Sequence, residues 1–286
     1  MFNKIKEQYL LMAPPMLWLL IFFIVPLIIV LGYSFCISEA TGGVKLEFTL
    51  GHYRLAFEGM YLYIFLKSFL YAGITTVITL AISFPMAYYM AFASPRMKMV
   101  MMLMIILPFW TNFLIRMYSL MTLLGESGLI NSMLLNLGIV DEPLPMMNNS
   151  FGMYVGFVYW NLPFMILPIA SSLDRMDVSL LEASLDLGAS KRQTFMNVTL
   201  PYSLPGLVAG IIFTFIPTLG NFVIPEFLGG PDNIMIGNVI TAQYLQARDW
   251  PFGSALSTVM MFVVMIFISL YIKYYNPTKN KNLVNF

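Results

Sequence analysis

Six long apolar segments follow one another along the chain, separated by shorter and more polar connections. The hydrocarbon core of a membrane is about 30 Å thick, so a helix needs roughly 20 apolar residues to cross it. The six segments are residues 10–33, 68–94, 100–120, 151–173, 202–224 and 252–272. We therefore predict an all-α, polytopic membrane protein with six transmembrane helices, in which residues 1–286 form a single transmembrane domain.

Composition supports this prediction, because 59% of the residues are hydrophobic, only 10% are charged and the mean hydropathy is +0.79. A soluble domain has about 25% charged residues. Cys36 is the only cysteine and His52 the only histidine, which excludes an intrachain disulfide and argues against a histidine-built catalytic or zinc site. No basic tract indicates a nucleic-acid partner. We expect the lipid bilayer as the surroundings, no nucleic acid and no metal site.

Lys4 and Lys6 precede the first apolar segment, an arrangement that signal peptides share. The segment is too long for a signal peptide and has no clear small-residue cleavage site. We expect it to be retained as the first span.

Basic residues divide unequally between the two sets of connections. Ten of the 15 Lys and Arg residues lie in the N-terminus, residues 95–99, residues 174–199 and the C-terminal tail, against five in the other connections. Cytoplasmic connections are the ones rich in Lys and Arg. We therefore predict that both termini and the 174–201 loop are cytoplasmic.

The 174–201 loop has the local signals of two short helices with a break between them. Asp177 is placed to cap the first helix, and Gly188 lies where that helix should end, because glycine enters the left-handed conformation without steric cost. Ser190 and Gln193 have the spacing of a capping box that starts a second helix. An ordinary connection between two membrane helices would show the same caps.

The same loop resembles the EAA loop of ABC-importer permeases, through Glu182-Ala183-Ser184, Gly188 and Leu200-Pro201. Ser184 replaces the usual second alanine, a small-for-small difference. The resemblance implies that a short coupling helix in this loop docks into a groove on a cytoplasmic ATPase subunit. The coupling residues that it implies are Glu182, Ala183, Gly188, Ala189, Ser190, Leu200 and Pro201.

Carboxylates favour the other side of the membrane, with nine of the 14 Asp and Glu residues in the outer connections. Such an excess favours the approach of a cation. Glu226 follows the breakable outer end of the fifth segment, where Pro217 and Gly220 interrupt a regular helix, and we expect it to meet the substrate; the alternative is a solvated loop acid. Asp249 is the second candidate, with a helix N-cap as its alternative.

Polar and aromatic residues near the spans are further candidates for the substrate path, because polar groups in a membrane are costly unless they pair or line a water path. These candidates are Trp110, Asn112, Tyr159, Trp160, Asn161 and Asn221. For Asn161, a hydrogen bond between helices is an equal alternative. Aromatic faces beside a carboxylate suit an ammonium ion. Arg116 is expected at the membrane interface, with its side chain snorkelling to water.

Three separated segments narrow the resemblance: residues 107–116, 236–240 and 248–253 are similar to the permease subunits of spermidine and putrescine importers. The resemblance covers nearly the whole chain and implies the type I ABC-importer permease fold. It implies a bacterial inner-membrane complex with a sister permease subunit, an ATPase homodimer and a periplasmic polyamine-binding protein. ATP and magnesium would bind the ATPase, and this chain would need no cofactor and be no enzyme.

Two other classes of function remain as alternatives. A secondary transporter of a small organic cation would need a coupling carboxylate in mid-membrane, and the six segments contain none there. An intramembrane enzyme would need a Ser-His pair, a histidine cluster or paired buried carboxylates. The chain also has no Gly-x-x-x-x-Gly-Lys-[Ser/Thr] loop, so it is not itself the ATPase.

Overall fold

The computed structural model describes residues 12–39 and 42–274, and Lys4, Lys6, Lys279, Lys281 and both termini lie outside that part of the chain. The chain divides into two compact units, which we describe separately. Of the described residues, 12–39, 42–62 and 239–274 belong to the first unit, and residues 63–238 belong to the second.

The first unit consists of helices and a small hairpin, which contacts α13. Helix α13 packs against α2 and α3, and the hairpin pairs Ile37 with Lys45 in an antiparallel register. The elements, with α12 crossing the boundary between the units, are the π-helix η1 (Leu20–Ile24), α2 (Val25–Tyr33), β1 (Ile37–Ser38), β2 (Val44–Lys45), α3 (Gly51–Ala56), α12 (Ile236–Leu245) and α13 (Trp250–Tyr274).

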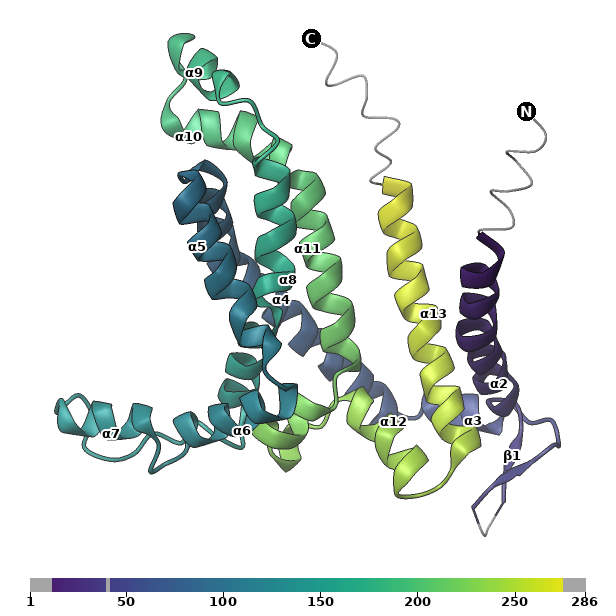
Figure 1. Ribbon diagram of the computed structural model, residues 1–286. Coiled ribbons are helices and arrows are strands. Elements are labelled where there is room, and N and C mark those ends of the chain that lie inside the picture. Colours follow the sequence, from purple (N-terminus) through teal and green to yellow (C-terminus); the bar gives the residue numbers. More distant parts are fainter. Residues whose placement is uncertain (1–11, 40–41, 275–286) are drawn as a thin grey trace, which may run out of the picture. The chain divides into compact units, whose positions relative to one another are not determined.

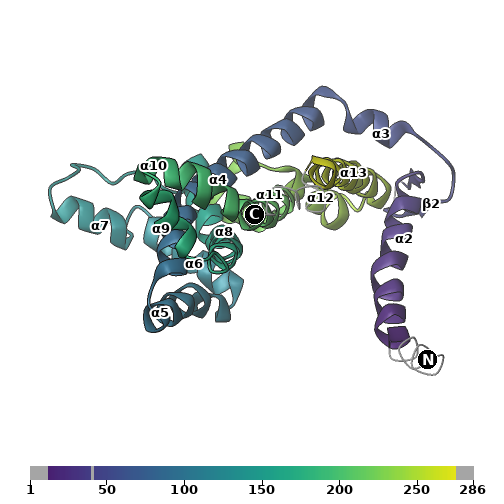
Figure 2. The same ribbon diagram turned by 90° about the horizontal axis from the view of Figure 1, so that it is seen from above.

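The second unit is built on the antiparallel pair α8 and α11, with α5 alongside (Figure 1). Helices α9 and α10 lie at one end of these helices, and α6 and α7 run across the other end (Figures 1 and 2). The elements are α4 (Gly59–Phe92), α5 (Pro95–Ile106), η2 (Leu107–Trp110), α6 (Phe113–Leu124), α7 (Leu129–Asn136), α8 (Ser150–Leu173), α9 (Ser179–Asp186), α10 (Lys191–Thr194), η3 (Phe195–Thr199), α11 (Leu200–Gly220), η4 (Pro225–Gly229) and η5 (Pro231–Asn233).

Six helical stretches of the described residues are long and apolar enough to cross a membrane, which confirms the predicted all-α membrane protein. They are Met12–Tyr33, Gly59–Phe92, Phe113–Asn136, Ser150–Leu173, Lys191–Gly220 and Trp250–Ser269. Five of them overlap the predicted segments closely. The predicted third segment, residues 100–120, is wrong as one continuous helix.

The third segment breaks at its centre because two residues there favour a turn. Helix α5 ends at Ile106, Pro108 lies in the short 3-10 helix η2, and Thr111 is extended with ψ 151°. Asn112 then accepts a hydrogen bond from the Leu114 amide at 2.8 Å and starts α6 as its N-cap. In Figure 1, α5 runs along α8 whereas α6 and α7 run across it, so the chain changes direction at this break.

Glycines allow α8 and α11 to approach closely. A Cβ atom added at Gly206 would lie 2.3 Å from the Pro168 carbonyl oxygen, and one added at Gly210 would lie 2.7 Å from the Met165 sulfur. Small residues at such points allow dispersion contacts between backbones, which drive helix association in membranes. The buried cluster of Met165, Ile166 and Ile169 packs beside this approach.

We predict that Gly206→Ala lowers the thermal unfolding temperature of the detergent-purified protein, because overpacking costs about 1–3 kcal/mol. Gly73→Ala is the matched control, since Gly73 lies inside α4 with open space around the added methyl group. Equal unfolding temperatures for the two variants would contradict the close approach of α8 and α11.

Candidate functional site

The 174–201 loop folds as two short helices separated by a glycine turn, as predicted. Gly188 has φ +85°, which only glycine adopts readily, and it separates α9 from α10. Ser190 and Gln193 form the complete capping box: the Ser190 amide donates to Gln193 Oε1 at 2.8 Å, and the Gln193 amide donates to Ser190 Oγ at 3.3 Å. Asp177 accepts a hydrogen bond from the Ser179 amide at 3.0 Å, which lowers the pKa of its carboxyl group.

A hydrogen bond joins the two loop helices directly. The hydroxyl groups of Ser184 and Thr194 lie 3.0 Å apart, so the residue that differs from the usual alanine connects α9 to α10. Around this contact the loop exposes large apolar side chains, and Leu187 is 89% exposed. The others are Val178, Leu180, Leu185 and Met196. An exposed apolar surface of this kind is typical of a docking site for another protein.

The loop is attached firmly to the helices that it connects. Tyr202 on α11 donates its hydroxyl hydrogen to the Arg175 carbonyl at 2.9 Å, and Ser172 on α8 donates to the Tyr202 carbonyl at 3.1 Å. Lys98 on α5 forms an ion pair with Asp174. Leu200 and Pro201 begin α11, so a force on the loop acts directly on that helix.

Glu182 and Ala183 lie on α9 and are exposed, while Ala189 lies between Gly188 and the capping box and is partly exposed. The Ala189 amide donates to the Ser184 carbonyl at 3.1 Å, which closes the end of α9. All seven predicted coupling residues therefore belong to one loop surface or to the helix that leaves it.

Glu226 is exposed on the π-helix η4, at the end of the second unit where α6 lies. The Asn238 amide group donates to Glu226 Oε2 at 3.1 Å and to the Phe222 carbonyl at 2.9 Å. Asn221 terminates α11 and accepts the Ile224 amide at 3.0 Å, so its side chain shapes the turn into η4. These contacts hold the carboxylate at a defined place without burying it.

Asp249 is a helix cap in the first unit. Its Oδ1 accepts the Phe252 amide at 3.0 Å at the start of α13 and also accepts the Ser38 hydroxyl. These bonds are those of a helix N-cap, which was the alternative to a role in the substrate path.

The other predicted path residues are not gathered in one place. Asn161 is fully buried and donates to Thr218 Oγ1 at 2.9 Å, which is a hydrogen bond between α8 and α11. Trp110 is 83% exposed at the end of η2, and Asn112 is the cap of α6. Tyr159 is half-buried on α8, next to Trp160. A role for these residues in the substrate path remains a prediction.

Comparison with known proteins decides the family. The model of the family described as "Binding-protein-dependent transport system inner membrane component" matches residues 59–281. This chain belongs to that family. Its members are components of transport systems of the inner membrane, so the chain is a transport permease.

Individual relatives are similar in sequence to this permease along nearly its whole length. The spermidine/putrescine transport system permease protein PotB of Escherichia coli (strain K12) is 38% identical over 254 residues, which cover 89% of this chain and 92% of that protein. PotB of Haemophilus influenzae is 37% identical over 280 residues, 97% of this chain and 96% of its own. The inner membrane ABC transporter permease protein YdcU of Escherichia coli (strain K12) is 33% identical over 276 residues, 91% of this chain and 87% of its own.

Solved structures show the same fold at lower identity. A chain of a bacterial alginate ABC transporter, in complex with a periplasmic protein that binds an alginate pentasaccharide, superposes with TM-score 0.77 at 17% identity. The match covers 94% of this chain and 95% of the other. The permease therefore has the fold of ABC-importer permeases.

Arg116 is the residue of the permease that sequence reasoning placed wrongly. It was expected at the interface with its side chain in water, but it is buried with 7% of its surface exposed. The break at Pro108 turns α6 away from the line of α5, and this turn brings the guanidinium beneath aromatic side chains of η2 and α8. One partial sequence signal was available, because Phe113 precedes Arg116 by three residues in α6, which is helical spacing.

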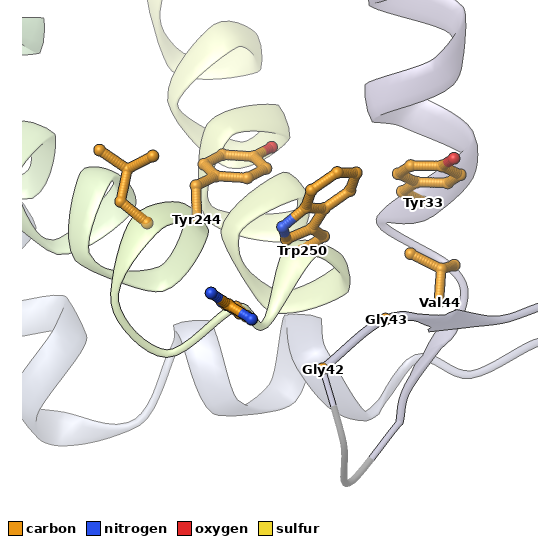
Figure 3. Close-up of a pocket in the computed structure, with 8 residues that line it drawn as sticks. Tyr33, Gly42, Gly43, Val44, Tyr244 and Trp250 are labelled. Atoms are coloured by element: carbon orange, nitrogen blue, oxygen red, sulfur yellow. The ribbon is translucent and has the colours of Figure 1, made fainter.

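A second feature not foreseen from the sequence is a pocket of about 630 Å³ in the first unit (Figure 3). Tyr244, Trp250 and Tyr33 form its aromatic wall, and Arg248, which has φ +54°, contributes a cation. Its lining residues include no carboxylate. Such a pocket does not suit a cationic substrate, and it contains none of the predicted site residues.

Proposed function

We propose that this permease is a transmembrane subunit of an ATP-driven importer for spermidine and putrescine. It would form half of the translocation path beside a sister permease subunit, and receive substrate from a periplasmic polyamine-binding protein. An ATPase homodimer, which binds ATP and magnesium, would drive the cycle through the 182–201 loop. The observation that supports this proposal best is the loop itself, a pair of short helices joined by a glycine turn, with exposed apolar side chains at one end of the α8–α11 pair.

The orientation belongs to the same proposal. The loop faces the cytoplasm because the basic residues concentrate on its side, and both termini lie on that side as well. The opposite end of the second unit, with α6 and η4, then faces the outer side, where the polyamine arrives. The names of the PotB relatives supply the substrate class.

A secondary transporter of a small organic cation is the competing proposal, and the described residues favour it less. Their buried polar and charged side chains include Arg116 but no carboxylate that could bind a coupling ion. Proteoliposomes containing the permease, sister subunit, ATPase and binding protein decide between the two, with labelled spermidine and putrescine as substrates. We expect uptake to require ATP hydrolysis and to continue in the presence of ionophores that dissipate ion gradients. Uptake with a hydrolysis-deficient ATPase would contradict the proposal.

We predict that Gly188→Val uncouples the permease from the ATPase. A β-branched residue is strained at positive φ, so the α9–α10 turn must open and move the docking surface. The expected result is an inserted complex with weakened ATPase association and little polyamine-stimulated ATP hydrolysis. Gly188→Asn is the matched control, because asparagine tolerates the left-handed conformation. Equal coupling in the valine and asparagine variants would show that the turn does not set the docking geometry.

We predict that Glu226→Gln lowers polyamine uptake at sub-saturating substrate while basal ATP hydrolysis and assembly are unchanged. The substitution removes the negative charge and keeps the shape and an acceptor for Asn238. Glu226→Asp should lower uptake less. Glu142→Gln, at another exposed acid of the outer connections, is the control for net charge. If Glu226→Gln and the control behave alike, Glu226 has no specific part in the path.

A further inference from the structure

Three aromatic rings of the second unit surround the guanidinium of Arg116. Its Cζ lies 4.3 Å from the centroid of the Phe109 ring, 4.9 Å from that of Trp160 and 5.9 Å from that of Phe113. The rings also contact one another, with Phe113 and Trp160 edge-to-face at 4.5 Å. We call Phe109, Phe113 and Trp160 the aromatic cage. They come from η2, α6 and α8, so the fold of the whole unit assembles it.

The contacts that the structure shows for the Arg116 guanidinium are with ring faces. Its Nε and Nη1 atoms are buried and have no hydrogen-bond acceptor, and no carboxylate among the described residues forms an ion pair with it. A buried cation without such partners is costly, so another attraction must replace its water. The negative faces of aromatic rings provide that attraction, which strengthens when the site is desolvated.

The attraction between a cation and a ring face does not depend on the guanidinium group, since ammonium groups bind aromatic cages in the same way. We propose that the aromatic cage is an ammonium-binding site of the permease, which Arg116 fills in this conformation. An ammonium group of the substrate would compete with the Arg116 side chain for the three rings. The substrate class rests on the proposed import of polyamines.

The surroundings of the cage fit the arrival of a cation from the η4 side. Trp110, the next residue after Phe109, is exposed, and Tyr118 on α6 contacts Phe227 of η4 edge-to-face at 5.4 Å. Glu226, the neighbour of Phe227, presents its carboxylate on the same short helix. An acid near the entrance attracts the ammonium group, and the cage then holds it after water is lost.

The occupation of the aromatic cage by the Arg116 side chain has a measurable consequence. A ligand that binds only the vacated cage shows an affinity reduced by the fraction of molecules in which the cage is vacant. An uncharged side chain of similar length at position 116 cannot compete with the ligand for the three rings. Such a substitution should therefore raise the fraction of molecules in which the cage is vacant. Weak binding in the resting permease would also let a polyamine leave the cage again.

The test measures binding of tetramethylammonium and of spermidine to the assembled, nucleotide-free complex in nanodiscs. Arg116→Met should lower the Kd of both ligands about tenfold, whereas Arg116→Lys, which keeps a cation for the rings, should bind like the unsubstituted protein. Adding Trp160→Leu to Arg116→Met should abolish the gain. The proposal is overturned if Arg116→Met binds no more tightly than the unsubstituted complex, or if its gain survives loss of Trp160.

A second measurement needs no change at Arg116. Saturating tetramethylammonium should change the tryptophan emission of the unsubstituted complex, and Trp160→Phe should remove that change. An equal emission change in both proteins would contradict binding at the cage.

These results are separable from the proposed function. Polyamine uptake by the unsubstituted complex, without a gain in ammonium binding by Arg116→Met, rejects the cage alone. Tight tetramethylammonium binding by Arg116→Met, without polyamine uptake by the unsubstituted complex, rejects the polyamine substrate and leaves the ammonium site.

Discussion

The close approach of α8 and α11 is the constraint on which the second unit depends. Gly206 and Gly210 leave room for the backbone and side chains of α8, and the Asn161–Thr218 hydrogen bond joins the same two helices farther along. The 174–201 loop is the connection between these helices, so its position follows from theirs. At the other end, Asn221 turns the chain from α11 into η4, which contacts α8. One helix pair therefore positions both the loop and Glu226.

Local signals explain why the loop could be predicted from the sequence. A capping box and a left-handed glycine depend on residues a few positions apart, so Ser190, Gln193 and Gly188 were sufficient to locate both helices and the break. Hydropathy located the spans for a similar reason, since crossing a membrane needs a long apolar stretch. In the third segment, composition remained apolar while Pro108 and Asn112 changed the backbone direction, and hydropathy does not detect that change.

The aromatic cage could not be predicted in this way, because it depends on contacts between distant residues. Phe109, Phe113 and Arg116 are near in sequence, but Trp160 belongs to another helix, and the turn at Thr111 decides whether the four side chains meet. For Asn161, the sequence shows a polar residue within a membrane span but does not identify its partner. The structure shows that the partner is Thr218. Sequence identified the polar and aromatic residues worth attention, and tertiary structure determined their neighbours.

The helical stretch Lys191–Gly220 runs without interruption from the capping box to the turn before η4, because the π-helix η3 joins α10 to α11. The stretch is not straight: α10 lies across the end of α8, whereas α11 runs along α8, so the helix changes direction between them (Figure 1). Because Gly206 and Gly210 pack α11 closely against α8, a displacement of α10 would move the start of α11 and its partner helix together. Motion at the docking surface would then reach the far end of the unit mechanically, with no bound ligand to relay it.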